Sequence, residues 1–312
     1  MPQIVITGSA GFIGRHVTRH AENLRLPLRL MSHHTEIPAT AHGTEIVPAD
    51  LRDPASLRGL CDGADVLIHC ASQIGGPREL CETVNTRGTE ALVEEALRSG
   101  VSRIVHLSTA AVYGRGVYRQ ARAEDLVRSP LSDTSRTRAA AEDIVLAAGG
   151  VVLRPHLVYG AHDAKVVPGL ARLLRTLPGS VEGWAGRTSA VAAEDLARVL
   201  VATALAPAER LTTSVYHANH PQPVLWSELL RAVAAALSLP WPGSDLTCHE
   251  AELHLEAQGI PTHDLDMVTT DHWFDSRPLW TAVACDPGPG FADRFPRYAS
   301  SYRNALMARE RV

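Results

Sequence analysis

The sequence has 312 residues, of which 45% are hydrophobic and 21% charged, and its formal net charge is −4. A chain of this length is longer than a single small domain, so we expect one large domain or two closely associated ones. The composition is ordinary for a soluble globular protein. The slight negative charge gives no electrostatic basis for binding nucleic acid or an anionic membrane. No apolar run approaches the roughly 20 residues that span a bilayer, and no signal peptide precedes the first strand. We therefore expect a cytoplasmic protein with no nucleic-acid and no membrane partner.

Cysteine and histidine spacing argues against disulfides and against a metal site. The five cysteines are odd in number and no two have CxxC spacing, as expected for reduced thiols. Residues 249–275 are rich in His and Asp, but their spacing matches no compact zinc pattern and HExxH is absent. We predict a solvated, irregular segment there and no metal.

Residues 1–160 alternate short β-rich runs with helical patterns, as parallel βαβ units do. We expect strands at 2–7, 27–32, 44–47, 64–70, 101–107 and 151–154. We expect helices from the first glycine turn to residue 23, and then at 80–99 and 135–148. Beyond residue 160 the pattern favours helices at 168–176, 193–206 and 226–237. Residues 245–312 are polar and rich in His, Asp and Pro, so we expect short helical pieces there at most.

The first predicted strand runs into a glycine turn that opens the first predicted helix. The turn has the spacing Gly8-x-x-Gly11-x-x-Gly14. One glycine permits the tight turn, one lets the backbone approach a pyrophosphate, and one lets helix and strand pack closely. The free N–H groups and the positive dipole at the helix start then hold the phosphates. In this position the motif predicts a dinucleotide site.

Five further motifs follow the glycine turn in order, and together they carry a family resemblance. The chain resembles the extended short-chain dehydrogenases/reductases, the family of sugar-nucleotide epimerases and dihydroflavonol reductases, over about residues 1–240. The motifs are TGSAGFIG at 7–14, DLRD at 50–53, HCAS at 69–72, VNTRGT at 84–89, STAAVYG at 108–114 and RPHLVYG at 154–160.

This resemblance implies an α/β fold with a Rossmann-type, doubly wound parallel sheet and a smaller C-terminal substrate-binding region. Residues 1–160 would form the NAD(P)-binding domain, and 161–312 a mainly substrate-binding region interleaved with it. The cofactor-binding positions it implies are Gly8, Gly11, Phe12, Ile13, Ser32, His33, Asp50, Leu51, Ala71, Ser72 and Pro155. The substrate-binding positions are Gln73, Tyr113 and His156.

The end of the second predicted strand bears on cofactor choice. NAD enzymes place an acid there for the ribose 2′-OH, whereas this chain has Ser32. No carboxylate would repel a 2′-phosphate, and Ser32, His33, His34 and Arg15 are potential donors to one. We predict NADPH, with NADH tolerated; the alternative is a surface loop that merely lacks an acid.

The family's catalytic Tyr-x-x-x-Lys pair is absent. The only lysine is Lys165, and the motif would need a tyrosine at position 161, which is Ala161. The resemblance places Thr134 at the tyrosine position and Arg138 at the lysine position, and it makes Thr109 the hydroxyl that hydrogen-bonds the carbonyl. Arg138 keeps a permanent charge for the ribose, but an aliphatic hydroxyl is a poor acid or base near neutral pH. A tyrosine from elsewhere is an alternative, and Tyr113 is the nearest by motif.

Three functions remain compatible with this departure. The first is an NAD(P)H-dependent ketoreductase whose substrate polarises its own ketone, as a peri-hydroxylated aromatic polyketide does. The second is a non-catalytic NADP-binding sensor that resembles the NmrA-like regulators. The third is a sugar-nucleotide reductase or epimerase with an unusual acid. The expected partner is therefore a small aromatic ketone. The resemblance also allows a homodimer through the helices at 80–99 and 135–148.

Overall fold

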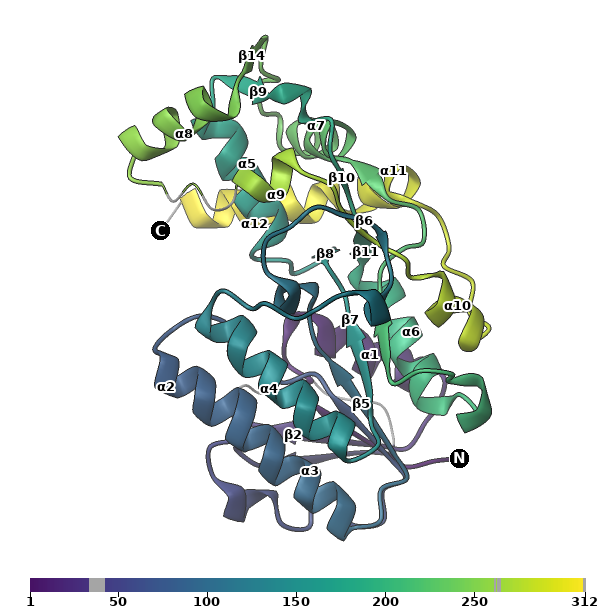
Figure 1. Cartoon of the computed structure of the whole chain (residues 1–312). Helices are drawn as coiled ribbons and strands as arrows, with labels where there is room; N and C mark the ends of the chain where they lie inside the picture. Colours follow the sequence, from purple (N-terminus) through teal and green to yellow (C-terminus); the bar gives the residue numbers. More distant parts are fainter. Residues whose placement is uncertain (34–42, 261, 263–264, 311–312) are drawn as a thin grey trace.

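The computed structural model describes residues 1–33, 43–260, 262 and 265–310. Its largest element is a seven-stranded sheet in the lower half of Figure 1, with a helical region stacked above it. The strands, in spatial order, are β12 (Val215–His217), β7 (Val151–Arg154), β5 (Arg103–Leu107), β4 (Val66–His69), β1 (Ile4–Thr7), β2 (Leu28–Ser32) and β3 (Thr44–Pro48).

The strand order reverses at β1: the chain adds β2 and β3 on one side of it, and then β4, β5, β7 and β12 on the other. Ile4 pairs in parallel with Leu28 of β2 on one side, and Thr7 pairs in parallel with His69 of β4 on the other. Every recorded pairing in this sheet is parallel. In such sheets a crevice opens at the carboxyl ends of the strands where the order reverses. The predicted α/β fold with a doubly wound parallel sheet is confirmed.

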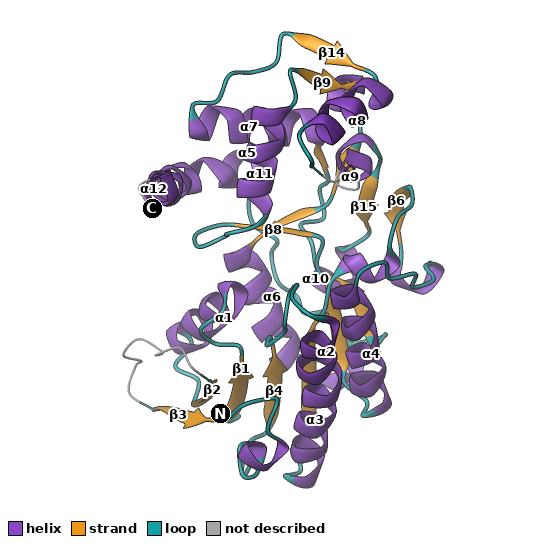
Figure 2. Cartoon of the chain, turned by 90° about the vertical axis from the view of Figure 1, so that its left-hand side faces the viewer, coloured by secondary structure: helices purple, strands orange, loops and turns teal. Residues whose placement is uncertain are grey.

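Helices cover both faces of the sheet, as Figures 1 and 2 show. On one face α1 (Phe12–Asn23) packs against α6 (Ala193–Leu205). On the other face lie α2 (Arg78–Cys81), α3 (Gly88–Arg98) and α4 (Asp133–Ala147). Strands buried on both faces need apolar side chains in both directions, which explains the near-continuous apolar runs of β1 and β4.

The helix predicted at 80–99 is continuous but has an irregular segment in its middle. A π-helical segment, Glu82–Arg87, joins α2 to α3, and Gly100 follows the helix with a φ of +75°. A π turn admits one extra residue per turn and often marks a functional position. Here it contains Asn85, whose side chain holds the loop after β4 by accepting the N–H of Gln73 at 2.7 Å.

The upper region is built around a second core that includes the fully buried Trp184 and Trp226. Its main helices are α5 (Val166–Thr176) and α7 (Trp226–Leu237), which agree with the predicted ranges to within two residues. Between α5 and α7 the chain returns to the large sheet, because α6 packs on one of its faces and β12 is one of its strands. The remaining strands are β6 (Tyr118–Ala121), β8 (Leu157–Tyr159), β9 (Gly179–Val181), β10 (Arg187–Thr188), β11 (Ala190–Ala192), β13 (Val224–Leu225), β14 (Ser244–Leu246) and β15 (His272–Phe274).

The expectation of only short helical pieces after residue 245 is wrong. This stretch forms α8 (Cys248–Ala257), α9 (Leu265–Thr269), α10 (Arg277–Ala282), α11 (Phe291–Arg294) and α12 (Ala299–Glu310). Two of them are regular helices of ten and twelve residues. A capping box begins α8, since Thr247 and Glu250 satisfy each other's backbone N–H groups, and α12 is anchored by buried Tyr302. Within the described part of the chain, no helix has both the length and the apolar character of a membrane span.

Candidate cofactor and substrate site

The turn after β1 leaves no room for a side chain at two of its glycines, Gly8 and Gly14. Gly8 has a φ of +70°, and a Cβ there would lie 2.7 Å from the backbone nitrogen of Ala71. A Cβ on Gly14 would lie 2.0 Å from the carbonyl oxygen of Gly8. The helix α1 begins at Phe12 with no side-chain cap, and Phe12 and Ile13 at its start line a cavity. A phosphate-bearing ligand fits this turn, because a helix start with uncapped N–H groups binds anions.

An elongated depression follows the carboxyl edge of the sheet on both sides of this turn. One part, of about 290 Å³, lies toward β2, and the other, of about 470 Å³, lies toward β5 and β7. The residues that line both parts are Gly8, Gly11, Ala71 and Ser72. Of the other predicted cofactor positions, Ser32, His33, Asp50 and Leu51 line the first part, and Phe12, Ile13 and Pro155 line the second. The structure therefore brings all of these positions together along one surface.

The first part ends in a charged group around Asp50. Its carboxylate accepts from Arg52 Nε at 2.9 Å and lies 2.8 Å from His33 Nε2. The hydrogen bonds from Arg52 hold the pKa of the Asp50 carboxyl well below its usual range. Arg52 lines the same cavity as Ser32 and was missed from the sequence, although it directly follows Leu51. His34, a predicted phosphate donor, lies outside the described residues.

The second part is closed by Arg138, which stands at the family's lysine position. One guanidinium nitrogen donates to the Leu107 carbonyl at 2.7 Å, whereas the buried Nε has no partner among the described residues. Burial lowers the pKa of Arg138 to about 10, so the side chain stays charged at neutral pH. A buried charge with an unsatisfied donor on the cavity wall suits the hydroxyls of a bound ribose.

The two candidate threonines have different surroundings. The Thr134 hydroxyl accepts the N–H of Gly75 at 2.9 Å, and Thr134 is not among the residues lining the cavities. Thr109 lines both the 470 Å³ part and a third cavity of about 480 Å³. Its hydroxyl accepts the N–H of Ala111 at 3.1 Å, which leaves its proton available to another acceptor. The geometry thus favours Thr109 over Thr134 as the hydroxyl that meets a substrate.

The third cavity lies between the 3₁₀ turn after β5, the start of α4, and β15. His156 lines it together with Thr109, and both residues also face the cofactor side. The His156 ring stacks on His272, with centroids 5.7 Å apart and planes 11° from parallel. Burial lowers the pKa of His156 to about 3, and its buried Nε2 has no partner within the described residues. His156 is therefore a neutral polar group on the wall that these cavities share.

The other two predicted substrate residues lie elsewhere. Tyr113 is 1% exposed, and its hydroxyl accepts from Arg154 at 2.7 Å and lies 2.7 Å from His217 Nε2. Tyr113 lines none of these three cavities, and its hydroxyl is held by core residues instead. Gln73 lines the 290 Å³ part and sits apart from His156.

Sequence reasoning also missed a buried charge network behind the site. Glu142 is 0% exposed and is paired with Arg154 and with Arg128 at 3.1 Å. The Ser108 hydroxyl donates to the same carboxylate. The available signal was a glutamate directly after the three alanines 139–141, together with the arginine of the RPHLVYG motif. Among the described residues, no group of three or more His, Cys, Asp or Glu is placed to hold a metal ion.

Comparisons with known proteins agree with this architecture. A 2-alkyl-3-oxoalkanoate reductase of Stenotrophomonas maltophilia is 26% identical over 88% of this chain and 92% of its own. A 4-hydroxy-2-methyl-3-oxo-4-farnesyl-3,4-dihydroquinoline-1-oxide ketoreductase of Stigmatella aurantiaca is 29% identical over 55% of this chain, and the match spans 54% of that protein.

A solved structure shows the same fold over nearly the whole length. It is a short-chain dehydrogenase/reductase superfamily protein from Agrobacterium tumefaciens with bound NAD. It superposes with a TM-score of 0.76, covers 99% of this chain and 100% of its own, and is 18% identical. The model of the NAD dependent epimerase/dehydratase family matches residues 4–217. The chain therefore belongs to the NAD dependent epimerase/dehydratase family, the extended short-chain dehydrogenases/reductases, which are NAD(P)-dependent enzymes.

Proposed function

We propose that this protein is an NAD(P)H-dependent ketoreductase that reduces a ketone of an angucyclinone-like aromatic polyketide in antibiotic biosynthesis. One observation carries the proposal: Thr109 and His156 lie where the cofactor-side cavity meets a 480 Å³ cavity, and no tyrosine lines either one. A pocket of this size holds a small polycyclic molecule. Thr109 and His156 are both neutral, so the ketone must bring part of its own polarisation.

The cofactor would be held by the glycine turn, by Asp50 at one end and by Arg138 at the other. When bound, the reduced nicotinamide supplies the hydride that reduces the ketone. Arg138 keeps its charge because its pKa of about 10 is still well above neutral pH. Its unpaired Nε gives the wall next to Thr109 a donor for a ribose hydroxyl.

The oxygen of the ketone becomes an alkoxide as it is reduced, and that charge needs hydrogen-bond donors. Thr109 contributes one neutral donor. Its hydroxyl oxygen accepts the N–H of Ala111, and its own O–H remains available to donate. A peri-hydroxyl on the substrate contributes a second, already bonded to the ketone before the reaction. The phenol proton passes to the alkoxide, and water restores it to the phenolate. This route needs no acidic side chain with a pKa near neutral.

Relatives and motifs support this substrate class. The names of two relatives describe reduction of oxo groups on a quinoline and on an alkanoate. The replacement of the tyrosine and lysine by Thr134 and Arg138 resembles the angucyclinone ketoreductase of simocyclinone biosynthesis.

NADPH is the proposed cofactor, with NADH tolerated. Ser32, His33 and Arg52 line the cavity where a ribose 2′-phosphate would lie, and Asp50 there is already paired with Arg52. A cytoplasmic location and a homodimer through α2–α3 and α4 are further proposals. Light scattering by the purified protein tests the dimer.

The test compares 8-hydroxy-1-tetralone with 1-tetralone, which lacks the peri-hydroxyl that forms the internal hydrogen bond. We expect NADPH oxidation with the hydroxylated ketone to exceed that with 1-tetralone by at least about tenfold in kcat/KM, the effect of one good hydrogen bond. Equal rates would contradict substrate assistance. Tight NADPH binding without turnover of either ketone would contradict the reductase and favour the NADP-binding sensor, which the involvement of Thr134 with Gly75 also allows.

A further inference from the structure

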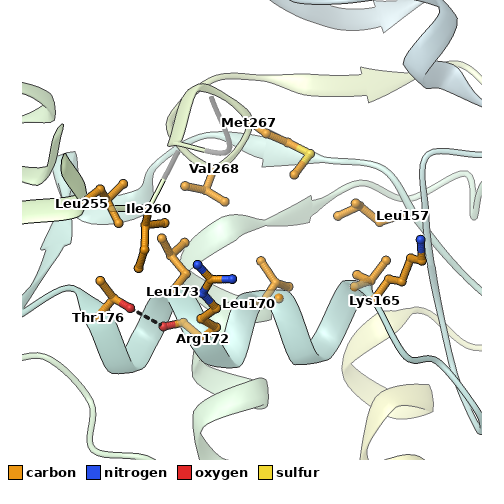
Figure 3. Close-up of a pocket in the computed structure, with 12 residues that line it drawn as sticks. Leu157, Lys165, Leu170, Arg172, Leu173, Thr176, Leu255, Ile260, Met267 and Val268 are labelled. Carbon is orange, nitrogen blue, oxygen red and sulfur yellow. Dashed lines mark hydrogen bonds between the residues drawn. The ribbon is translucent and has the colours of Figure 1, made fainter. Parts of the chain in front are cut away.

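A fourth cavity, of about 390 Å³, lies between α5, the end of α8 and α9. Figure 3 shows Leu170 and Leu173 of α5 facing Val268, with Leu255 and Ile260 closing one end. Most of its wall is aliphatic. Its lining residues are Leu157, Lys165, Val166, Gly169, Leu170, Arg172, Leu173, Thr176, Leu255, Ile260, Met267 and Val268.

This α5 cavity adjoins the proposed reaction site and shares wall residues with it. Leu157 and Met267 also line the 480 Å³ cavity that contains Thr109. Lys165 and Val166 also line the cofactor-side cavity. An arm that passes Leu157 would therefore carry a molecule whose ketone lies at Thr109 from one cavity into the other. A bare bicyclic ketone would leave the α5 cavity empty.

Two cations stand on the rim of this apolar space. Lys165 and Arg172 are both exposed, and within the described residues neither side chain has an ion pair. Figure 3 shows Lys165 at the end near Leu157 and Arg172 at the middle of α5. Cations at the edge of an apolar wall suit an amphiphile that ends in an anionic group.

We propose that the α5 cavity binds an apolar arm of the ketone substrate, and that Arg172 holds a carboxylate at the end of that arm. The inference deepens the proposed reduction and rests on it for the identity of the ketone. Each methylene buried in the cavity strengthens binding by up to about fourfold. An arm of several carbons thus contributes to selectivity without contacting the reacting carbonyl.

Gly169 offers a way to fill the cavity without disturbing the fold. It lies within α5 and lines the cavity, and a Cβ added there meets no atom within 4 Å. Leucine is a better helix former than glycine, so Gly169→Leu should fold as well as the parent. Gly169→Ala is the matched control, because it makes the same change to the helix and leaves the cavity open.

The kinetic arm of the test uses 8-hydroxy-1-tetralone with and without a carboxyhexyl substituent. For the substituted ketone we expect Gly169→Leu to raise KM at least about tenfold, and for the bare ketone to change it less than twofold. Gly169→Ala should stay within twofold of the parent on both. Arg172→Gln should raise KM for the carboxyhexyl ketone and leave KM for a hexyl ketone unaffected.

The binding arm uses fluorescent cis-parinaric acid and cofactor-free protein. We expect the parent to bind it and Gly169→Leu to bind it at least about tenfold more weakly. Unchanged parinarate binding together with an unchanged KM for the substituted ketone would overturn the proposal. If neither tetralone is reduced but Gly169→Leu still abolishes parinarate binding, the subsite for an apolar acid stands and the proposed reduction fails.

Discussion

At the scale of single residues, Thr109 and Thr134 differ in what their hydroxyls can reach. Thr109 lines the reaction cavity, whereas Thr134 accepts the N–H of Gly75. We expect Thr109→Val to lower kcat about 100-fold, because it removes a donor to the developing alkoxide. Thr134→Val should lower kcat less than threefold. Steady-state kinetics with 8-hydroxy-1-tetralone and NADPH measures both.

Thr109 also caps the turn that starts at Ala110, so a structural effect must be separated from a catalytic one. Thr109→Ser keeps the hydroxyl, and we expect it to retain most of the activity. Thermal unfolding of the valine variant reports any loss of stability from the cap. If Thr134→Val were as damaging as Thr109→Val, the assignment of the donor to Thr109 would be wrong.

Arg52 is the residue expected to separate NADPH from NADH. Arg52→Ala removes a cation from the cavity that also contains Ser32. We expect the Kd for NADPH to rise about tenfold or more, since a charge-assisted hydrogen bond to the 2′-phosphate is lost. The Kd for NADH should change less than threefold. Calorimetric titration measures both, with Arg58→Ala, an exposed neighbour that lines none of these cavities, as the control; equal weakening of the two cofactors would refute the role.

Motifs locate residues along the chain but do not give the direction of a side chain. The predicted cofactor positions lie on one surface because the glycine turn and the strand ends fix their backbone. Tyr113 belongs to an equally clear motif, yet its ring points into the core, where Arg154 and His217 bind its hydroxyl. Arg52 was overlooked for the converse reason: nothing in the local pattern shows that it turns toward Ser32.

At the scale of elements, α4 and α6 lie within two residues of their predicted ranges. Periodicity placed α1, α5 and α7 well because each buries one apolar face in a large core. It did not give the π segment that joins α2 to α3, since one inserted residue leaves the apolar pattern almost unchanged. It also missed α12, whose helical form depends on distant contacts. Tyr302 there accepts the N–H of Gly160 at 2.7 Å, a contact between residues 142 positions apart.

The start of α4 fixes the position of Arg138, and a capping box defines that start. Ser132 Oγ accepts the N–H of Ser135 at 3.0 Å, and Ser135 Oγ accepts the N–H of Ser132 at 3.0 Å. We expect Ser132→Ala to lower the free energy of unfolding by about 1 kcal/mol. Urea denaturation measures it against Ser129→Ala, an exposed serine just outside the helix. Equal stability of the two variants would mean that the box does not stabilise α4.

At the scale of the whole molecule, the cavities are the least predictable feature. The α5 cavity is formed mainly by Leu157, by one helix of the predicted set and by Leu255, Ile260, Met267 and Val268, which lie in a stretch that the sequence indicated only as polar. Local sequence patterns show which face of each helix or strand is buried. A cavity, however, forms only where elements distant in the sequence pack together and leave a space between them. The sheet order was predictable because right-handed βαβ units leave few alternatives.

Buried histidines distributed across the sheet should make the whole protein acid-sensitive. Burial lowers the pKa of His106, His156 and His217 each to about 3, from 6.5 when exposed. Between these values the unfolded chain binds more protons than the folded chain, so stability is complete above pH 6.5 and falls as the pH drops toward 3. Each histidine contributes a slope of about 1.4 kcal/mol per pH unit.

Urea unfolding at several pH values between 4 and 7 tests this acid sensitivity. The variant His106→Leu removes one titrating group, whose ring packs 4.9 Å from that of His69. We expect its unfolding free energy to depend less steeply on pH, by about 1.4 kcal/mol per pH unit below pH 6. The exposed His249 provides the control, since His249→Gln should leave the slope unchanged. A slope that is the same in both variants would show that His106 does not resist protonation in the fold.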